Sequence, residues 1–102
     1  MTIARVWRGV TPRSKREEYL AYLKETGVDE IRNTPGNLGV RIYVRNTKQG
    51  SEFIFVSFWK SMSAIRRFAG DDVEKARYYP KDREFLMKLE WKVRHYETAF
   101  ES

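Results

Sequence analysis

Three side chains near the C-terminal end could take part in acid–base chemistry: His95, Tyr79 and Tyr78. His95 is the single histidine, and imidazole is the side chain whose ordinary pKa lies closest to neutrality. It could accept a proton from a hydroxyl group of a bound molecule. Either tyrosine could donate a hydrogen bond to a phenolate or carbonyl oxygen. We predict these three as candidate catalytic residues, with packing as the alternative for each. Because adjacent residues point in different directions, we expect at most one of the two tyrosines to face a pocket.

Aromatic and basic side chains elsewhere could bind a ring or an anion. Trp59 could stack on an aromatic ring or serve in packing. Arg41 and Arg45 flank Tyr43 and could attract an anionic or phenolate substrate. Ion pairs with Glu52 or another carboxylate across a hairpin are the favoured alternative. The predicted substrate-binding residues are Trp7, Tyr43, Phe55, Trp59 and Arg41.

Composition excludes several kinds of site and partner. Cysteine is absent, which excludes disulfides, thiolate nucleophiles and cysteine-ligated metals and fits the cytoplasmic location we expect. The acidic pair Asp71 and Asp72 has no histidine nearby, so we predict no metal site. No apolar run approaches the ~20 residues of a membrane span, and we expect no membrane contact. The net charge is +6, but lysine and arginine are spread along the chain, which favours a solvated basic surface over nucleic-acid binding.

Periodicity and turn signals predict one α+β domain over residues 1–102. The predicted strands are 2–11, 38–45, 53–59 and 90–98, and the predicted main helices are 13–25 and 62–69. Gly27 is expected to end the first helix, and Ser61 to cap the second. A helical turn is expected at 28–32, and short helical pieces at 71–76 and 80–88. The order β-α-β-β-α-β is that of a ferredoxin-like fold, with an antiparallel four-stranded sheet and both main helices on one face.

The third strand is apolar on both faces, so each face needs a cover. We expect the helices to cover an aliphatic side formed by Ile54, Val56 and Phe58 with Val40, Ile42, Val44, Ala4 and Val6. The other side would carry Arg5, Trp7, Arg41, Tyr43, Arg45, Phe53, Phe55, Ser57 and Trp59. That aromatic surface exceeds what a monomer normally leaves exposed, so we predict a homodimer with its sheets facing each other and a cavity between sheet and helices.

Three segments carry a family resemblance: Ser57-Phe58-Trp59-Lys60-Ser61, Ala64 to Gly70, and Ala76-Arg77-Tyr78-Tyr79-Pro80-Lys81-Asp82. From about Ile3 to Glu97 the chain resembles the antibiotic biosynthesis monooxygenase superfamily, the dimeric α+β-barrel proteins. The resemblance implies two sheets back to back and one pocket per subunit. It also implies a small aromatic or polycyclic substrate, oxygenated without a metal or bound cofactor, as in some relatives.

Other relatives bind and degrade haem, and this branch fits less well. They use an asparagine on the first strand, a tryptophan at the end of the third strand and a histidine on the following helix. Trp59 matches the tryptophan, but Trp7 stands at the asparagine position. No histidine lies between Ser61 and Arg94. Haem degradation is therefore the less favoured activity.

Two further functions stay open. The RNA-recognition motif has the same element order and stacks bases on aromatic residues of its third strand. Phe53, Phe55, Val56 and Phe58 match its signature, but the basic-glycine start and the small residue are missing. Nucleic acid is therefore an unlikely partner. A dimer that binds a hydrophobic metabolite without catalysis would need the same aromatic cavity as an oxygenase.

Overall fold

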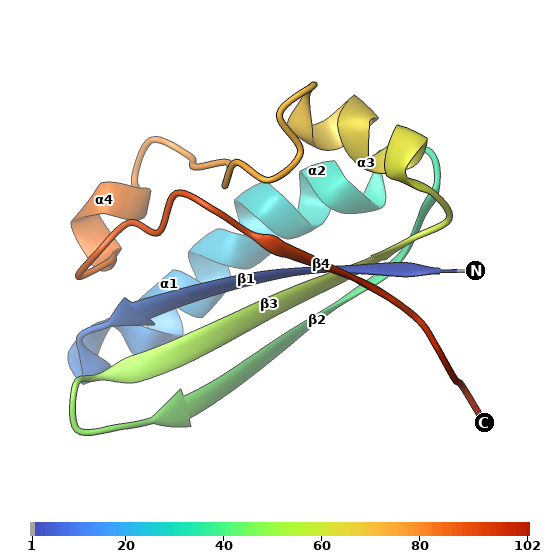
Figure 1. The fold of residues 1–102 in the computed structure, drawn as a ribbon. Helices are drawn as coiled ribbons and strands as arrows, with labels where there is room; N and C mark the ends of the chain where they lie inside the picture. The colour runs from blue at the N-terminus through green and yellow to red at the C-terminus, as the bar shows by residue number, and fades with distance from the viewer. Residues whose placement is uncertain (1) are drawn as a thin grey trace.

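The computed structural model describes residues 2–102 as a four-stranded antiparallel sheet with helices on one side (Figure 1). Its strand order is β2-β3-β1-β4, which confirms the ferredoxin-like α+β fold. The elements are β1 (Ile3–Thr11), η1 (Arg13–Lys15), α1 (Arg16–Leu23), η2 (Lys24–Val28), α2 (Asp29–Arg32), β2 (Asn37–Asn46), β3 (Ser51–Trp59), α3 (Met62–Ala69), α4 (Asp82–Phe85) and β4 (Arg94–Glu97).

The first helical region is longer than expected, because Gly27 does not end it. Helical structure continues from α1 through the π-helical turn η2 into α2. Tyr19, Leu23, Gly27 and Ile31 recur every four residues and are buried against the sheet. A Cβ added at Gly27 would lie 3.6 Å from the ring of Phe55. That is an ordinary van der Waals distance, so the glycine neither ends the helix nor is required by its packing on the sheet.

The caps of α3 follow the sequence prediction. The Ser61 hydroxyl accepts a hydrogen bond from the Ala64 amide at 3.1 Å, which satisfies a free donor of the first turn. Gly70 ends the helix with φ of 85°, a conformation that glycine adopts without strain. Between these caps Ile65 and Phe68 are buried toward the sheet.

The chain from Asp71 to Val93 is more irregular than predicted. No helix forms at 71–76, because this stretch pairs with the chain just before β4. The Ala76 amide donates to the Trp91 carbonyl, and the Val93 amide donates to the Glu74 carbonyl, both at 2.7 Å. The predicted helix at 80–88 is reduced to α4, and the last strand is reduced to β4.

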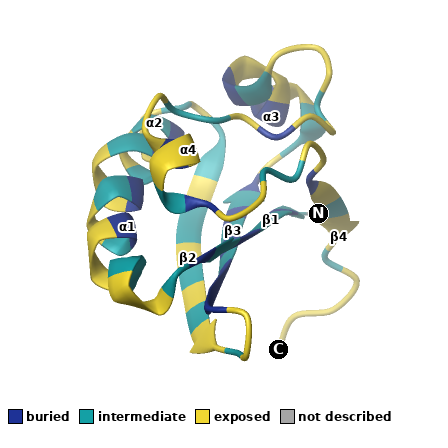
Figure 2. Cartoon of the chain, turned by 90° about the vertical axis from the view of Figure 1, so that its left-hand side faces the viewer, coloured by how far each residue is buried: buried dark blue, intermediate teal, exposed yellow. Residues whose placement is uncertain are grey.

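The faces of β1 and β3 are the reverse of the prediction. Phe55 pairs in register with Trp7 and Ile42, so these three side chains share one side of the sheet. We call the side beneath the helices the covered face and the opposite side the open face; Figure 2 shows the helices on the covered face. The covered face buries Phe53, Phe55, Ser57 and Trp59.

The open face therefore carries Ile54, Val56 and Phe58, together with Ala4 and Val6. The prediction, which placed these five residues beneath the helices, was wrong. The prediction was correct for β2, whose Val40, Ile42 and Val44 pair with covered residues of β3. Because β3 is apolar on both sides, alternation could not choose between its faces. The larger rings occupy the deeper space beneath the helices.

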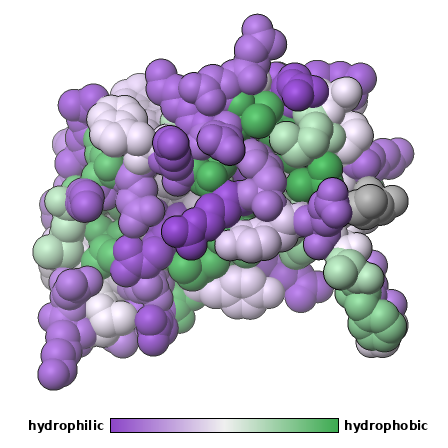
Figure 3. Space-filling view, viewed as in Figure 1, coloured by the Kyte–Doolittle hydropathy of each residue, from purple (hydrophilic) through white to green (hydrophobic). Residues whose placement is uncertain are grey.

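The open face keeps apolar side chains at the surface. Ile54, Val56 and Phe58 are only partly buried, and Tyr43 and Tyr96 are each 52% exposed. Figure 3 shows apolar groups exposed between charged ones on the side of the molecule that faces the viewer. Within residues 2–102 no helix is long and apolar enough to cross a membrane.

Candidate functional site

A cavity of about 60 Å³ lies between the covered face of the sheet and the helices. Its wall comes from β1, β3, the first helical region, α3 and the irregular chain after α3. The lining residues are Arg5, Trp7, Tyr19, Leu23, Gly27, Ile31, Phe55, Ser57, Phe68, Arg77, Tyr78, Tyr79, Asp82 and Val93. Aromatic rings dominate this wall, while the polar groups are few, which is the usual make-up of a small-molecule site.

Trp7 and Tyr78 form one wall of the cavity. The Trp7 indole N–H donates to the Tyr78 hydroxyl at 3.2 Å, and the rings meet edge to face with centroids 6.2 Å apart. The Tyr78 hydroxyl in turn donates to the carbonyl of Glu90. Burial raises the pKa of Tyr78, so its phenol stays protonated at neutral pH. Tyr78 can thus serve as a hydrogen-bond donor and not as a base.

Tyr79 also lines the cavity, so the expectation that at most one of the two tyrosines faces it was wrong. The segment is irregular rather than helical, and both rings reach the same space. The Tyr79 hydroxyl donates to Glu30 on α2. Arg77 Nη2 lies 2.7 Å from the other oxygen of that carboxylate. Burial, and next the bond to Glu30, raise the pKa of Tyr79.

Asp82 is a buried carboxyl group of the cavity wall that sequence reasoning did not select. Its Oδ1 accepts the Tyr19 O–H at 2.9 Å, and its Oδ2 accepts the Tyr79 amide at 2.6 Å. Burial raises the pKa of Asp82. The pKa of Tyr19 is also raised, first by burial and next by the negative charge of the Asp82 carboxylate. Its place in the Tyr-Tyr-Pro-Lys-Asp run was the only available signal.

Arg5 was placed on the open face by sequence reasoning, but it lies on the covered face and is 5% exposed. Its Nη1 donates to the Val73 carbonyl and lies 3.0 Å from His95 Nε2. Its Nη2 donates to the Lys75 carbonyl at 3.1 Å. Burial lowers the pKa of Arg5 to about 10, so the guanidinium stays charged at neutral pH. An arginine between Ala4 and Val6 in an apolar strand was the signal that could have marked it.

His95 lies beside Arg5 rather than in the cavity wall itself. Burial, and next the charge of Arg5, lower the pKa of His95 below its ordinary value of 6.5. The imidazole is therefore neutral at neutral pH. A neutral ring nitrogen facing a guanidinium acts as hydrogen-bond acceptor, which places the ring proton on the other nitrogen.

The other predicted binding residues are divided between the two faces. Trp7 and Phe55 lie in the cavity wall. Trp59 is fully buried behind it, donates its indole N–H to Ser57 Oγ at 2.8 Å and stacks on Phe68. Tyr43 and Arg41 point to the open face and do not meet the cavity.

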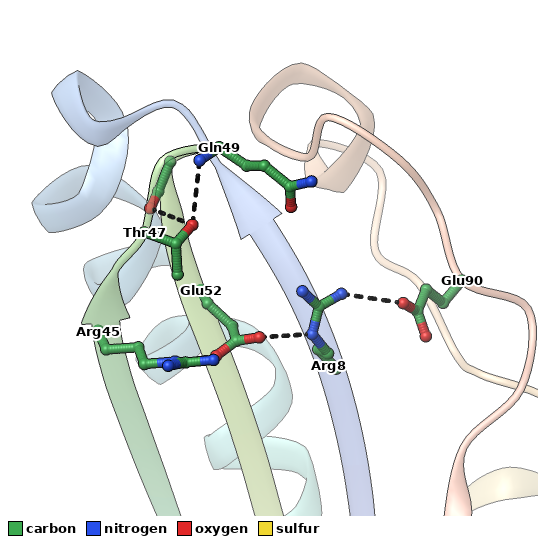
Figure 4. Close-up of polar contacts among 7 residues, drawn as sticks. Arg8, Arg45, Thr47, Gln49, Glu52 and Glu90 are labelled. Carbon is green, nitrogen blue, oxygen red and sulfur yellow. Dashed lines mark hydrogen bonds and ion pairs between the residues drawn. The ribbon is translucent and has the colours of Figure 1, made fainter.

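A charged cluster occupies the hairpin end of the open face (Figure 4). The Glu52 carboxylate accepts from Arg45 Nε at 2.6 Å and from Arg8 Nε at 2.7 Å, which confirms the ion pair predicted for Arg45. The hydrogen bond from Arg45, and next that from Arg8, lower the pKa of Glu52. Arg41 makes no ion pair with any residue in the range 2–102.

Comparison with solved structures identifies relatives of the same fold. A haem-free haem-degrading protein from Mycobacterium tuberculosis has a TM-score of 0.67 and 16% identity, covering 100% of this chain and 99% of its own. A proposed antibiotic biosynthesis monooxygenase from Bacillus cereus has a TM-score of 0.67 and 10% identity, covering 99% and 98%. A Mycobacterium tuberculosis haem degrader with two haems bound in its active site has a TM-score of 0.60 and 15% identity, covering 98% of both chains.

These identities are low enough that the likeness concerns the fold alone. A comparison with curated proteins found no match. The family model described as antibiotic biosynthesis monooxygenase matches residues 4–76, a range that contains β1, the first helical region, β2, β3 and α3. The match covers most of the chain and both strands that carry Arg5, Trp7, Phe55 and Ser57. The chain therefore belongs to the antibiotic biosynthesis monooxygenase family.

Proposed function

We propose that the protein is a homodimer that binds a small aromatic molecule in the cavity and oxygenates it without a metal or organic cofactor. The observation that carries this proposal is the cavity itself. Its aromatic wall lies on the covered face, and the tyrosines in that wall are protonated, each donating its O–H to a group of the protein that a ligand would have to replace. Membership of the family supports monooxygenation as the type of reaction.

The reaction would use the electrons of the substrate. A phenol that loses its hydroxyl proton becomes an electron-rich phenolate, and O₂ can attack its ring carbon. One oxygen atom then enters the ring as a quinone carbonyl, and the other leaves as water with the two hydrogens removed from the phenol. Trp7 and Phe55 would hold the ring and exclude water. His95 is the candidate proton acceptor, but it lies outside the cavity wall and its free nitrogen faces Arg5, so the proton would reach it only when that contact opens.

The size of the cavity indicates that its wall must move when a ligand enters. An apolar cavity of about 150 Å³ admits benzene, whereas this one measures about 60 Å³. The chain from Arg77 to Asp82 contributes four lining residues and contains only the start of one short helix. Its contacts with Glu30 hold it against α2. We expect this segment to shift outward on binding.

The open face supports the homodimer. Ile54, Val56 and Phe58 project from the central strand β3, and exposed Tyr43 and Tyr96 stand on the two edge strands. A second copy facing this surface would remove these apolar groups from water, which is favourable in proportion to the area buried. The dimer would then leave the cavity of each subunit on the outer, helix-covered side.

The positions of the relevant aromatic residues and of the histidine make haem and RNA less favoured ligands. Trp59, the residue that matches the haem branch, is fully buried and does not line the cavity. No histidine lies on α3, since the single histidine is beside Arg5 on β4. Phe53 and Phe55, which would stack bases in an RNA-recognition motif, are buried beneath the helices and not displayed on the open face.

The test is an oxygen-uptake screen over a set of quinols and polycyclic phenols, run in the presence of a metal chelator. Gly27→Ala is the sharpest variant, because its Cβ would project toward Phe55 and Tyr79 while alanine favours the helix by about 1 kcal/mol. We expect turnover of the identified substrate to fall although the melting temperature rises. Glu25→Ala, an exposed helical position, is the matched control and should keep full turnover.

Uptake that is unchanged in Gly27→Ala would show that the chemistry takes place elsewhere. Binding of a quinol without any oxygen uptake would replace catalysis by the binding role that the sequence left open.

A further inference from the structure

We propose that Arg5 and Ser57 form a subsite that holds an anionic oxygen of the ligand, so that the protein selects acidic aromatic molecules bound as carboxylate or phenolate. This inference rests on the proposed function in one respect, since it takes the cavity to be the ligand site. It goes further by naming the chemical class of the ligand and the residues that recognise it.

Arg5 is a buried cation without a carboxylate partner in the described chain. The side chain is 5% exposed, and among residues 2–102 no carboxylate lies within ion-pair distance of its guanidinium. The other arginine of the cavity wall, Arg77, has its carboxylate partner Glu30 at 2.7 Å. A buried charge is costly; three hydrogen bonds and the ring of Phe68, 5.8 Å from the guanidinium carbon, offset part of that cost for Arg5, but no opposite charge does. An anionic ligand would supply the missing charge.

Arg5 also has guanidinium N–H groups that donate to no acceptor in the described chain. A guanidinium has five N–H groups. The hydrogen bonds to Val73, His95 and Lys75 use two of them on Nη1 and one on Nη2. Nε and the second Nη2 hydrogen have no acceptor among residues 2–102. Paired guanidinium donors bind a carboxylate through two parallel hydrogen bonds, and Arg5 is part of the cavity wall.

Ser57 lies beside Arg5 on the covered face of the sheet. It pairs in register with Arg5 across β1 and β3, so the two side chains stand next to each other on the covered face. Ser57 is 1% exposed, and its Oγ accepts the Trp59 indole N–H. Its own O–H has no acceptor within the described chain, and Ser57 also lines the cavity. The sheet thus places an arginine and a serine with a free hydroxyl hydrogen side by side in the cavity wall.

Asp82, the carboxyl group of the cavity wall, does not compete with a ligand for the Arg5 and Ser57 subsite. Asp82 is held by Tyr19 and Tyr79, with one hydrogen bond to each carboxyl oxygen. It therefore needs no cation from the ligand and gives the cavity an acidic side away from the Arg5 and Ser57 pair. Trp7 follows Arg5 by two residues on the same face of β1. A ring lying along Trp7 and Phe55 can direct its acidic group toward Arg5.

The experiment compares 1-naphthoate with its neutral isostere 1-naphthamide by calorimetry at pH 7.5 on the full chain. We expect the carboxylate to bind about ten-fold more tightly or better, as a charge-assisted pair implies. Arg5→Met should abolish that preference, so that the two compounds bind with about equal affinity. Arg66→Met, an exposed arginine of α3, is the matched control and should keep the preference.

A second arm separates phenolate from carboxylate recognition. The affinity for 4-nitrophenol, measured below and above the pKa of the compound, should rise on ionisation in the wild type and not in Arg5→Met. Arg5→Lys provides a test should the methionine variant fail to fold, because it keeps the charge but loses the guanidinium fork. We expect it to retain only part of the preference. Ser57→Ala should likewise reduce the preference without abolishing it.

The outcomes separate this inference from the proposed function. Equal affinity of the wild type for acid and amide, with the Trp7 indole NMR signal shifted by both, would overturn the Arg5 subsite and leave the cavity as the ligand site. A preference that survives Arg5→Met and Arg5→Lys would also overturn it. Failure of both compounds to shift Trp7 would count against the cavity, and the subsite would fall with it.

Discussion

Arg5 Nη1 and His95 Nε2 lie 3.0 Å apart, where β1 and β4 pair on the covered face. A guanidinium therefore faces the one imidazole of the chain, and protonation of that imidazole would place two positive charges in contact. The pair keeps His95 neutral and opposes its protonation, while Arg5 keeps its charge. An oxyanion bound at Arg5 would reduce this repulsion and make proton transfer to His95 more favourable.

Removal of the Arg5 charge should raise the pKa of His95. In the wild type, burial is the main cause that lowers this pKa below 6.5, and Arg5 is the second, while Glu74 acts in the opposite direction. Arg5→Met should move the value part of the way back toward 6.5, since burial remains. An NMR titration of the His95 ring protons measures the change. Arg94→Met removes a charge on the adjacent residue and should have little effect; equal shifts in both variants would refute a specific pair.

The ion-pair cluster at the hairpin should contribute modestly to stability, with a defined pH dependence. Glu52→Gln should lower the free energy of unfolding by about 1 kcal/mol, because Arg8 and Arg45 are partly exposed and solvent screens the pairs. The folded-state pKa of Glu52 is depressed, so this contribution is present above the ordinary value of 4.5 and is lost as the pH falls through the folded value. Urea unfolding at a series of pH values should show the full difference between wild type and variant at pH 7 and a difference that shrinks as the pH falls below 4.5. A difference that stayed constant down to the lowest pH at which the protein folds would assign the effect to packing.

The sequence was sufficient for the order of the main elements along the chain and for most of the first three strands. Alternation in β2, the short glycine-containing loop and the Ser61 cap each carry a local signal that the structure reproduces. The two faces of β3 were not predictable in the same way. Both are apolar, so the choice depends on ring size, register and the shape of the helix layer, which are tertiary properties.

The site was only partly predictable for related reasons. Trp7, Phe55, Tyr78 and Tyr79 were selected as aromatic candidates, and the fold brings them into one wall. Arg5 was missed because it was assigned to the side of the sheet away from the helices, the side expected to face a second copy of the protein.

Tyr78 and Tyr79 lie between the two helical pieces expected after Gly70, and as adjacent residues they were expected to point in different directions. Pairing of Ala76 and Val93 with Trp91 and Glu74 keeps that segment irregular instead. These contacts join residues far apart in sequence, and no local pattern encodes them.

Weakening the contacts between Glu30 and the cavity-wall segment 77–82 should make the backbone of this segment more mobile. Glu30 binds both Arg77 and Tyr79, so Glu30→Gln weakens two contacts between α2 and this segment. We expect faster hydrogen exchange of the backbone amides at residues 77–81, with α1 unchanged, and a loss of global stability below about 1 kcal/mol because the ion pair is part-exposed. Asp29→Asn, on the adjacent exposed residue, is the control. Identical exchange in the two variants would mean that Glu30 does not restrain the segment.

The open face should control association. Val56→Lys places a charge at the middle of β3, beside Arg41 in the register, where a second sheet would have to desolvate it. Light scattering should give the mass of two chains for the wild type and of one chain for this variant. Ala21→Lys, on the exposed side of α1, should remain dimeric. A wild type with the mass of one chain would contradict the proposed homodimer.

The most direct measurement is a crystal structure with the tightest-binding compound from the quinol and aromatic-acid screens. The account predicts ligand density on the covered face, with the ring against Trp7 and Phe55, the acidic oxygen at Arg5, and the segment around Tyr79 displaced outward. Density on the open face beside Tyr43 and Arg41, with the cavity unchanged, would contradict it.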